Sequence, residues 1–122
     1  MKLHNKNLGN DGELLIAQQL KSEGYTIIAH NYRTRTGEVD LIAQYGDTIA
    51  FIEVKTRSNQ YGDLSEVITI SKQKKICMAA RQYIAEHNIN DKVCRFDVAL
   101  IEYINHQPQP KIQYISNAFE YE

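Results

Sequence analysis

The sequence has little of what marks membrane, secreted or repetitive proteins. No run of 18 or more apolar residues occurs among its 122 residues, so no membrane-spanning helix is expected. The first fifteen residues hold no apolar stretch of signal-peptide length, and internal repeats and low-complexity segments are absent. These absences predict a cytoplasmic protein with no membrane partner, and the length suits one domain with a core of its own.

Cysteine, proline and net charge are also scarce. Cys77 and Cys94 form no CxxC motif and no ligand cluster with the four histidines, so we expect two reduced, buried thiols and no zinc site. Both prolines fall in "HQPQP", residues 106–110, which predicts a loop. The formal net charge is −1, which argues against strong, general nucleic-acid binding, because such proteins are usually basic.

Apolar spacing and turn residues predict seven elements in the order α-β-β-β-α-β-β, and hence a mixed sheet flanked by helices. In chain order they are a helix over 10–23, a strand over 25–32, the two strands of a hairpin over 37–57, a helix over 71–87, and strands over 93–104 and 111–115. We expect Asn10 or Asp11 to cap the first helix and Ser71 the second, with Gly24 closing the first. A loop over 58–69 and a loosely docked tail over 116–122 complete the prediction.

The hairpin contains charges that a buried strand does not ordinarily hold. Gly46-Asp47 is a strong signal for a two-residue turn, and a turn there fixes the register of the two strands. This register places Asp40 opposite Glu53, and Glu38 opposite Lys55. Glu53 and Lys55 share one face of their strand, because side chains alternate between the two faces.

Two carboxylates that face each other on a sheet repel, and a divalent cation between them removes the repulsion. Mg²⁺ typically takes one or two carboxylates plus phosphate oxygens, which suits phosphodiester hydrolysis. Lys55 is placed to hold the attacking water or to neutralise charge in the transition state. Glu13, on the buried stripe of the first helix, is a further candidate ligand. Each residue alone has an ordinary explanation, a solvated face, a turn or a helix dipole, and it is their combination that favours a site.

This constellation resembles the PD-(D/E)xK nuclease superfamily. The segments "GEVDLIA" and "FIEVKTR", with "GNDGELLIAQQLKSEGY" before them and "RFDVALI" after them, resemble more narrowly the YraN family of bacterial proteins. The resemblance implies a restriction-endonuclease-like αβββαβ core in a single domain over 1–122, with the core over about 8–104 and a C-terminal strand and tail over 105–122. The superfamily's Pro is absent here, since Val39 precedes Asp40.

The resemblance also implies roles for individual residues. Asp40, Glu53, Lys55 and Glu13 match catalytic positions, and the three acids among them match metal ligands for Mg²⁺ or Mn²⁺. The leading hypothesis is therefore a Mg²⁺-dependent endonuclease that hydrolyses DNA phosphodiester bonds, with branched or repair intermediates as candidate substrates. A nucleic-acid-binding module of the same fold with little turnover is the alternative, and a small interaction protein with a vestigial acidic cluster is a third.

Basic residues of the middle of the chain are the candidates for phosphate contact. Residues 30–81 hold eight Lys and Arg against six Asp and Glu, a balance of +2. The candidate nucleic-acid-binding residues are Arg35, Arg57, Lys72 and Lys75, of which two lie in the first turn of the second predicted helix, where the amide groups favour anions. Cutting a symmetric junction would need a homodimer. A nearly neutral chain is expected to bind nucleic acid weakly by itself, so a partner protein is also a candidate. Asp97, in "RFDV", is expected to have a structural role, paired with Arg95 on the same face or with the basic second helix.

Overall fold

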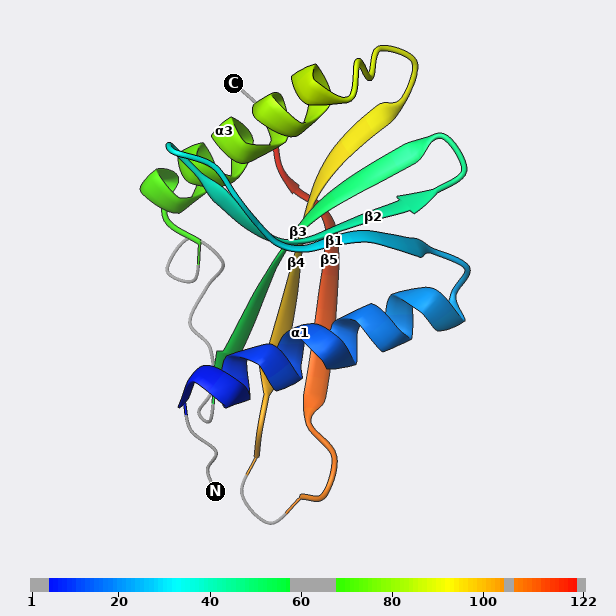
Figure 1. The fold of residues 1–122 in the computed structure, drawn as a ribbon. Coiled ribbons are helices and arrows are strands. Elements are labelled where there is room, and N and C mark those ends of the chain that lie inside the picture. The colour runs from blue at the N-terminus through cyan, green and yellow to red at the C-terminus, as the bar shows by residue number, and fades with distance from the viewer. Residues whose placement is uncertain (1–4, 58–67, 105–106, 121–122) are drawn as a thin grey trace.

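The computed structural model describes residues 5–57, 68–104 and 107–120, with side chains from residue 11 onward. Its elements are α1 (Asn5–Ser22), β1 (Thr26–Arg33), β2 (Glu38–Tyr45), β3 (Thr48–Arg57), α3 (Ile70–Glu86), β4 (Val93–Glu102) and β5 (Lys111–Phe119). The strands form one mixed sheet in the order β1-β2-β3-β4-β5, in which only β3 and β4 are parallel. The predicted αβββαβ order with a mixed sheet is confirmed (Figure 1).

The two helices cover opposite faces of the sheet, with β3 at its centre (Figure 1). Ile52 and its neighbours pack under α1, while Phe51 and its neighbours pack under α3. Both residues are fully buried, which explains why β3 is an almost continuous apolar run rather than an alternating one. None of the helices in the described ranges is long and apolar enough to cross a membrane.

Helix α1 begins earlier than predicted and ends where predicted. It starts at Asn5, so Asn10 and Asp11 lie inside the helix and the prediction that either one caps it is wrong. Gly24 ends it with a φ of 102°, a conformation that glycine adopts without strain. The Gly24 N–H bonds to the Lys21 carbonyl, and the next N–H bonds to the Leu20 carbonyl, so the last carbonyls of the helix have hydrogen-bond donors.

Helix α3 is capped by Thr69 rather than by Ser71, which lies within the first turn. The Thr69 side chain accepts a hydrogen bond from the Lys72 backbone N–H at 3.1 Å. The predicted buried stripe is confirmed at Ile76, Ala79, Ala80 and Tyr83. The turn between β1 and β2 lies directly against this helix: a Cβ on Gly37 would sit 2.0 Å from the Lys75 carbonyl oxygen. Only glycine permits that approach.

The hairpin register is as predicted over most of its length. Pairs run from Tyr45–Thr48 at the turn to Leu41–Ile52, and Gly46 in the turn has a φ of 58°. The paired ladder ends there, one step before Asp40 and Glu53. The prediction that these two acids are directly paired across the hairpin is therefore wrong, and so is the pairing of Glu38 with Lys55, because the strands part first.

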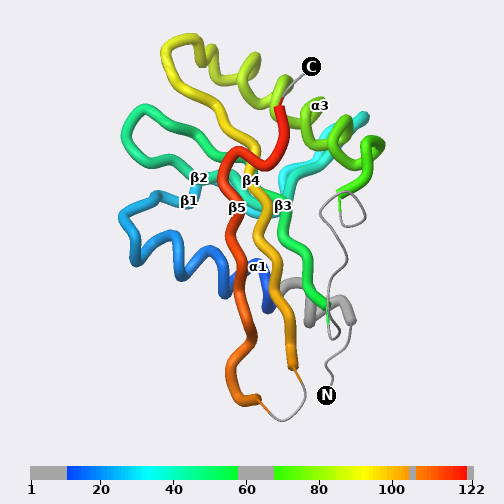
Figure 2. Tube along the Cα trace, turned by 180° about the vertical axis from the view of Figure 1, so that it is seen from behind, coloured from blue at the N-terminus to red at the C-terminus, as the bar shows by residue number. Residues whose placement is uncertain are grey.

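The C-terminal strand is longer than predicted. β5 continues to Phe119, whose ring stacks on Phe96 of β4 at a centroid distance of 5.1 Å, so residues 116–119 are not a loose tail. Figure 2 shows β5 along β4 at the edge of the sheet. Neither cysteine is in a disulfide bond, but only Cys77 is buried, so the prediction that Cys94 is buried is wrong. Most of the loop predicted over 58–69 lies outside the described residues.

Candidate active site

The candidate site lies in a fork between β2 and β3. The two strands pair as far as Leu41 and Ile52. The part of β2 before Leu41 lies against α3, whereas the part of β3 after Ile52 runs toward the start of α1 (Figure 1). Val39 packs in the core under α3 and Leu41 in the core under α1, although residues two apart in a regular strand share a face. The regular alternation therefore breaks at Asp40, the residue between them.

Asp40 bridges the two arms of the fork. The Val54 backbone N–H donates a hydrogen bond to Asp40 Oδ2 at 2.8 Å. A carboxylate thus supplies an acceptor to β3 beyond the end of the paired ladder. This contact fixes the Asp40 side chain in the fork and prevents a buried N–H from being left unpaired.

Glu53 is a buried carboxylate that is only half satisfied. The residue is 2% exposed, and its Oε1 atom has no hydrogen-bond partner. Its Oε2 atom lies 3.4 Å from Lys72 Nζ and 3.9 Å from Lys55 Nζ. Burial and the charge of Asp40 raise the pKa of Glu53 to about 7, against the opposing effect of the two ammonium groups. An unpartnered buried oxygen is costly and calls for an explanation.

Glu13 reaches the site because α1 approaches β3 closely. A Cβ on Gly12 would sit 2.6 Å from Thr56 Oγ1, so a larger residue would push the helix away. Burial and the charge of Asp40 raise the pKa of Glu13 to about 7, while a hydrogen bond from Asn31 acts to lower it. Asn31 has a φ of 51°, an uncommon conformation outside glycine.

The acids are arranged around Asp40. Its charge raises the pKa of both Glu13 and Glu53. Within the described ranges, no three Asp, Glu, His or Cys side chains make up a ready metal-binding group. Two carboxylates, together with water and phosphate oxygens, are nevertheless enough to coordinate Mg²⁺. The Oε1 atom of Glu53, which has no hydrogen-bond partner, is available as a metal ligand. The donor chemistry therefore fits a hard divalent ion.

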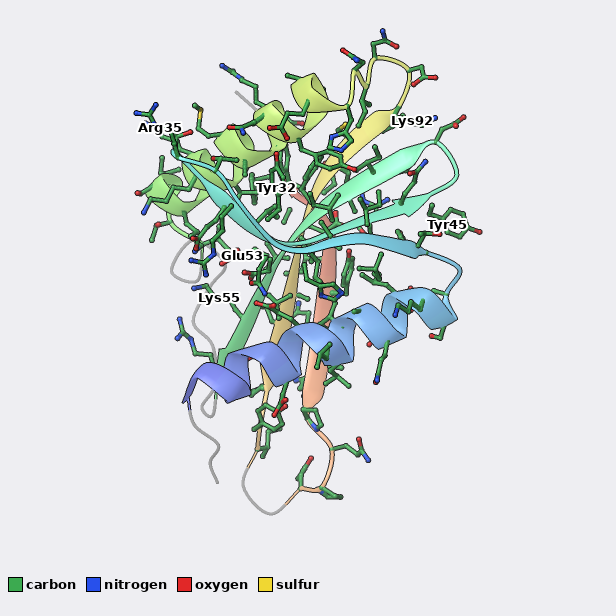
Figure 3. The ribbon with its side chains drawn as sticks, in the orientation of Figure 1. Tyr32, Arg35, Tyr45, Glu53, Lys55 and Lys92 are labelled. Carbon is green, nitrogen blue, oxygen red and sulfur yellow. The ribbon has the colours of Figure 1, made fainter. Side chains whose placement is uncertain are left out.

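Two lysines from different elements enter the cluster. Lys55 lies two residues after Glu53 on β3, and Figure 3 shows both residues at the same side of the sheet, between α3 and α1. Lys72 comes from the first turn of α3 and also lies 3.3 Å from Glu38 Oε2. The sequence suggests phosphate contact for Lys72, and in the structure its ammonium group lies beside Glu38 and Glu53.

The other predicted phosphate contacts lie at the surface. Arg35 is exposed in the turn between β1 and β2, on the same side of the molecule as Lys55 (Figure 3). Lys75 is exposed on α3, next to that turn through the Gly37 contact. Arg57 is exposed at the end of β3. The structure thus places Arg35 in the turn that packs against the Lys75 backbone, and Arg57 at the end of β3.

Asp97 has the structural surroundings that the sequence predicts. It is fully buried and accepts hydrogen bonds from Arg95 Nε at 2.9 Å, from the Tyr114 hydroxyl at 2.6 Å and from the Asn117 N–H at 2.9 Å. Arg95 also donates to the Tyr25 hydroxyl at 2.8 Å. Only the Arg95 pairing was readable from sequence, because the two tyrosines and Asn117 lie far away along the chain.

Sequence reasoning missed Lys72 and Asn31 as members of the acidic cluster. Lys72 carried a usable signal: it opens a helix whose first turn packs beside the hairpin. Asn31 carried none, because it lies within a predicted strand, 18 residues along the chain from Glu13.

Fold and site together define a class: an α/β domain of αβββαβ order with carboxylates and lysines gathered where its two central strands part. Residues 12–101 match the family described as "Uncharacterised protein family UPF0102". The chain belongs to this family, which confirms the predicted YraN-family membership.

Relatives align over nearly the whole chain. A "UPF0102 protein" of Geobacter metallireducens is 44% identical over 121 residues, covering 98% of each chain. One from Rhodococcus opacus is 45% identical, covering 95% of this chain and 98% of the relative. One from Alkaliphilus metalliredigens is 46% identical, covering 93% and 98%.

A solved structure of Hjc, a Holliday junction resolvase from Archaeoglobus fulgidus, is also similar. The TM-score is 0.45 at 16% identity, covering 85% of this chain and 72% of that chain. The assignment of the fold given above rests on the element order and the sheet topology themselves.

Proposed function

We propose that this protein is a metal-dependent nuclease that hydrolyses DNA phosphodiester bonds, with Mg²⁺ or Mn²⁺ as its metal. The observation that carries the proposal is Glu53, a buried carboxylate with one bare oxygen and two ammonium groups facing the other. A domain retains so costly a group more readily for chemistry than for stability. The match of these positions to the PD-(D/E)xK motif supports the same reading.

The three acids divide the work of holding the ion. Asp40 and Glu53 are the direct ligands, and Glu13 supports Asp40 from α1, directly or through water. The ion, when bound, supplies a more acidic water and positive charge beside the attacked phosphate. Because the pKa values of Glu13 and Glu53 are raised to about 7, both carboxyls hold protons in mildly acidic solution and lose them when a cation arrives.

Lys55 is the residue that we assign to the reacting water. Its ammonium group lies 3.9 Å from Glu53 Oε2, and its side chain is partly exposed. Lys55 can therefore reach both a proposed metal ligand and the solvent. An ammonium group there orients a water by hydrogen bonding and offsets the negative charge that grows on the phosphate oxygens.

The exposed cations are assigned to the DNA backbone. Arg35 lies in the turn that packs against α3, Lys75 is exposed on α3, and Arg57 lies at the end of β3, so a strand that crosses the fork would meet positive charge on both arms. A net charge of −1 makes such binding weak and dependent on geometry, which favours branched or repair intermediates over ordinary duplex. A symmetric substrate would require a homodimer. The free thiols of Cys77 and Cys94 accord with a cytoplasmic location.

The second candidate function is a nucleic-acid-binding module of this fold with little turnover. The observation that favours it is the same low net charge, together with the engagement of Lys72 by acids rather than by solvent. Such a module binds DNA with a salt-dependent affinity and leaves it intact.

A cleavage assay separates the two functions. Branched, single-stranded and duplex DNA are incubated with the protein in Mg²⁺, in Mn²⁺ and in chelator. We expect metal-dependent cleavage that falls by about 10²–10³-fold in Asp40→Asn and in Lys55→Met, the usual size of effect when one charged group at a reacting centre is removed. The matched control is Glu86→Gln, an exposed carboxylate on α3 that is remote from the fork.

Binding without cleavage in both metals would favour the module. The proposal fails if wild type cuts no DNA in either metal, or if Asp40→Asn cuts as fast as Glu86→Gln.

A further inference from the structure

We propose that Lys72 is an internal counter-ion of the metal site: it neutralises the acids of the fork in the free protein and is released when a divalent ion binds. This inference rests on the proposed function, because it presumes that the fork takes a metal. It gives Lys72 a positioning role in the site, distinct from the surface phosphate contact that its sequence position suggests.

The contacts of Lys72 join the two arms of the fork. Its ammonium group lies 3.3 Å from Glu38 Oε2 on β2 and 3.4 Å from Glu53 Oε2 on β3. Lys55 approaches the same Glu53 oxygen less closely, at 3.9 Å, and comes from the same strand as Glu53. Lys72 is therefore the cation that links α3 to both strands.

Competition follows from the geometry of Glu53. The carboxylate is almost completely buried, so its two oxygens share one small space, with Lys72 on Oε2 and nothing on Oε1. An ion held by Oε1 and Asp40 would cancel much of the charge that attracts the ammonium group and would repel it directly. The backbone N–H of Lys72 is held by the Thr69 cap, so only the side chain needs to move.

Release gives the ammonium group a second use. The Lys72 side chain is 26% exposed and starts from the first turn of α3, so a modest rotation takes it from the acids to solvent. Freed there, it adds positive charge to the side of the fork where Lys75 and Arg35 lie. Metal binding would then prepare the surface for a phosphate, and by linkage a phosphate bound by Lys72 would tighten the metal.

The first test uses the wild-type protein. An amine-reactive reagent is applied with and without Mn²⁺, and the modification of each lysine is followed by peptide mass spectrometry. We expect the modification rate of Lys72 to rise roughly threefold or more with Mn²⁺, as its bound population falls. Lys74, exposed on the same helix, is the internal control and should keep its rate. An unchanged or slower rate at Lys72, in a protein that calorimetry shows to bind Mn²⁺, overturns the inference.

The second test compares Lys72→Met with Lys74→Met, which remove the same charge from the same helix. Mn²⁺ is titrated calorimetrically at pH 8, and thermal melts establish that both variants fold. We expect the Kd for Mn²⁺ to fall about tenfold in Lys72→Met, because a competing cation is gone, and to stay at the wild-type value in Lys74→Met. Equal Kd values in wild type and Lys72→Met contradict the inference alone. Absence of Mn²⁺ binding in wild type and both variants contradicts the proposed function as well.

Discussion

Glu53 and Asp97 are two buried carboxylates on neighbouring strands with opposite surroundings. They lie one ladder step apart, since Asp97 of β4 pairs with the residue before Glu53 on β3. Glu53 is 2% exposed and Asp97 is 0% exposed, so burial does not distinguish them. They face opposite sides of the sheet, Glu53 toward α3 and Asp97 toward α1.

Their hydrogen bonds differ completely. Both oxygens of Asp97 are engaged, by Arg95, Tyr114 and a backbone N–H, and the Arg95 contact uses two nitrogens of the guanidinium group. Glu53 has one oxygen with no partner and the other beside two ammonium groups at 3.4 and 3.9 Å. Asp97 thus resembles a completed structural network, and Glu53 a group that awaits a ligand.

The comparison teaches how to separate structural from functional charge in a sheet. A buried carboxylate whose partners are all present is explained by the fold, and its neighbours are expected to matter for stability. A buried carboxylate with a bare oxygen is not explained by the fold, and its removal should cost function rather than stability. The predictions below test this division, from the largest expected change in stability to the smallest.

Loss of the Asp97 partner is the largest effect. Arg95→Met leaves the Asp97 charge buried without its bidentate partner, and we expect the free energy of unfolding to fall by about 3–5 kcal/mol. Urea denaturation measures the change. Lys92→Met is the control: it removes a cation that pairs with Asp47 and Asp91, two exposed acids, and should cost no more than about 1 kcal/mol. Similar losses in both variants would show that the buried Asp97 network contributes no more to stability than a surface ion pair.

Glu53 should respond in the opposite direction. Glu53→Gln removes a charge that folding takes out of water, and we expect the free energy of unfolding at pH 8 to rise by about 2 kcal/mol. The same substitution should abolish metal-dependent cleavage. At pH 5 wild-type Glu53 is already protonated, since burial and Asp40 raise its pKa to about 7, so the gain should vanish there. A loss of stability at pH 8 would mean that Glu53 is a structural charge like Asp97.

The smallest effect is the pH dependence of wild type. The raised pKa values of Glu13 and Glu53 mean that the folded state holds more protons than the unfolded state between about pH 4.5 and 7. Their contribution to stability is therefore present below about pH 4.5 and is lost as the pH rises through 7. We expect the metal-free Tm to fall by roughly 8 °C from pH 5 to 8, with most of that fall absent in Glu53→Gln. A Tm difference between wild type and this variant that is the same at both pH values contradicts the assignment to Glu53.

Much of the fold was predictable because local signals agree with one another. The Gly46-Asp47 turn fixed the hairpin register, and apolar periodicity located α3 and its buried stripe. The start of α1 was missed, because residues 5–10, "NKNLGN", are mostly polar and show no apolar stripe of helical spacing. The extension of β5 was also missed, since "SNAF" is polar in sequence and its place in the sheet depends on Phe119 packing on Phe96.

The candidate site was predictable in its members but not in its geometry. The motif identified Asp40, Glu53 and Lys55 from their spacing alone. The register argument then placed the acids face to face, and it failed because the strands part at Leu41, a consequence of how β2 follows α3 rather than of the hairpin itself. Contacts across long sequence separations, such as Lys72 with Glu53, have no local signature.

The most direct test of the central claim is calorimetric titration of Mn²⁺ into wild type, into Asp40→Asn combined with Glu53→Gln, and into Asp91→Asn as an exposed-acid control. The account predicts that wild type and Asp91→Asn bind Mn²⁺ with equal affinity, that the double variant does not bind, and that Mn²⁺ raises the Tm of the first two only. Binding that survives in the double variant, or a wild type that binds no metal, would contradict the claim that the fork between β2 and β3 is a metal site.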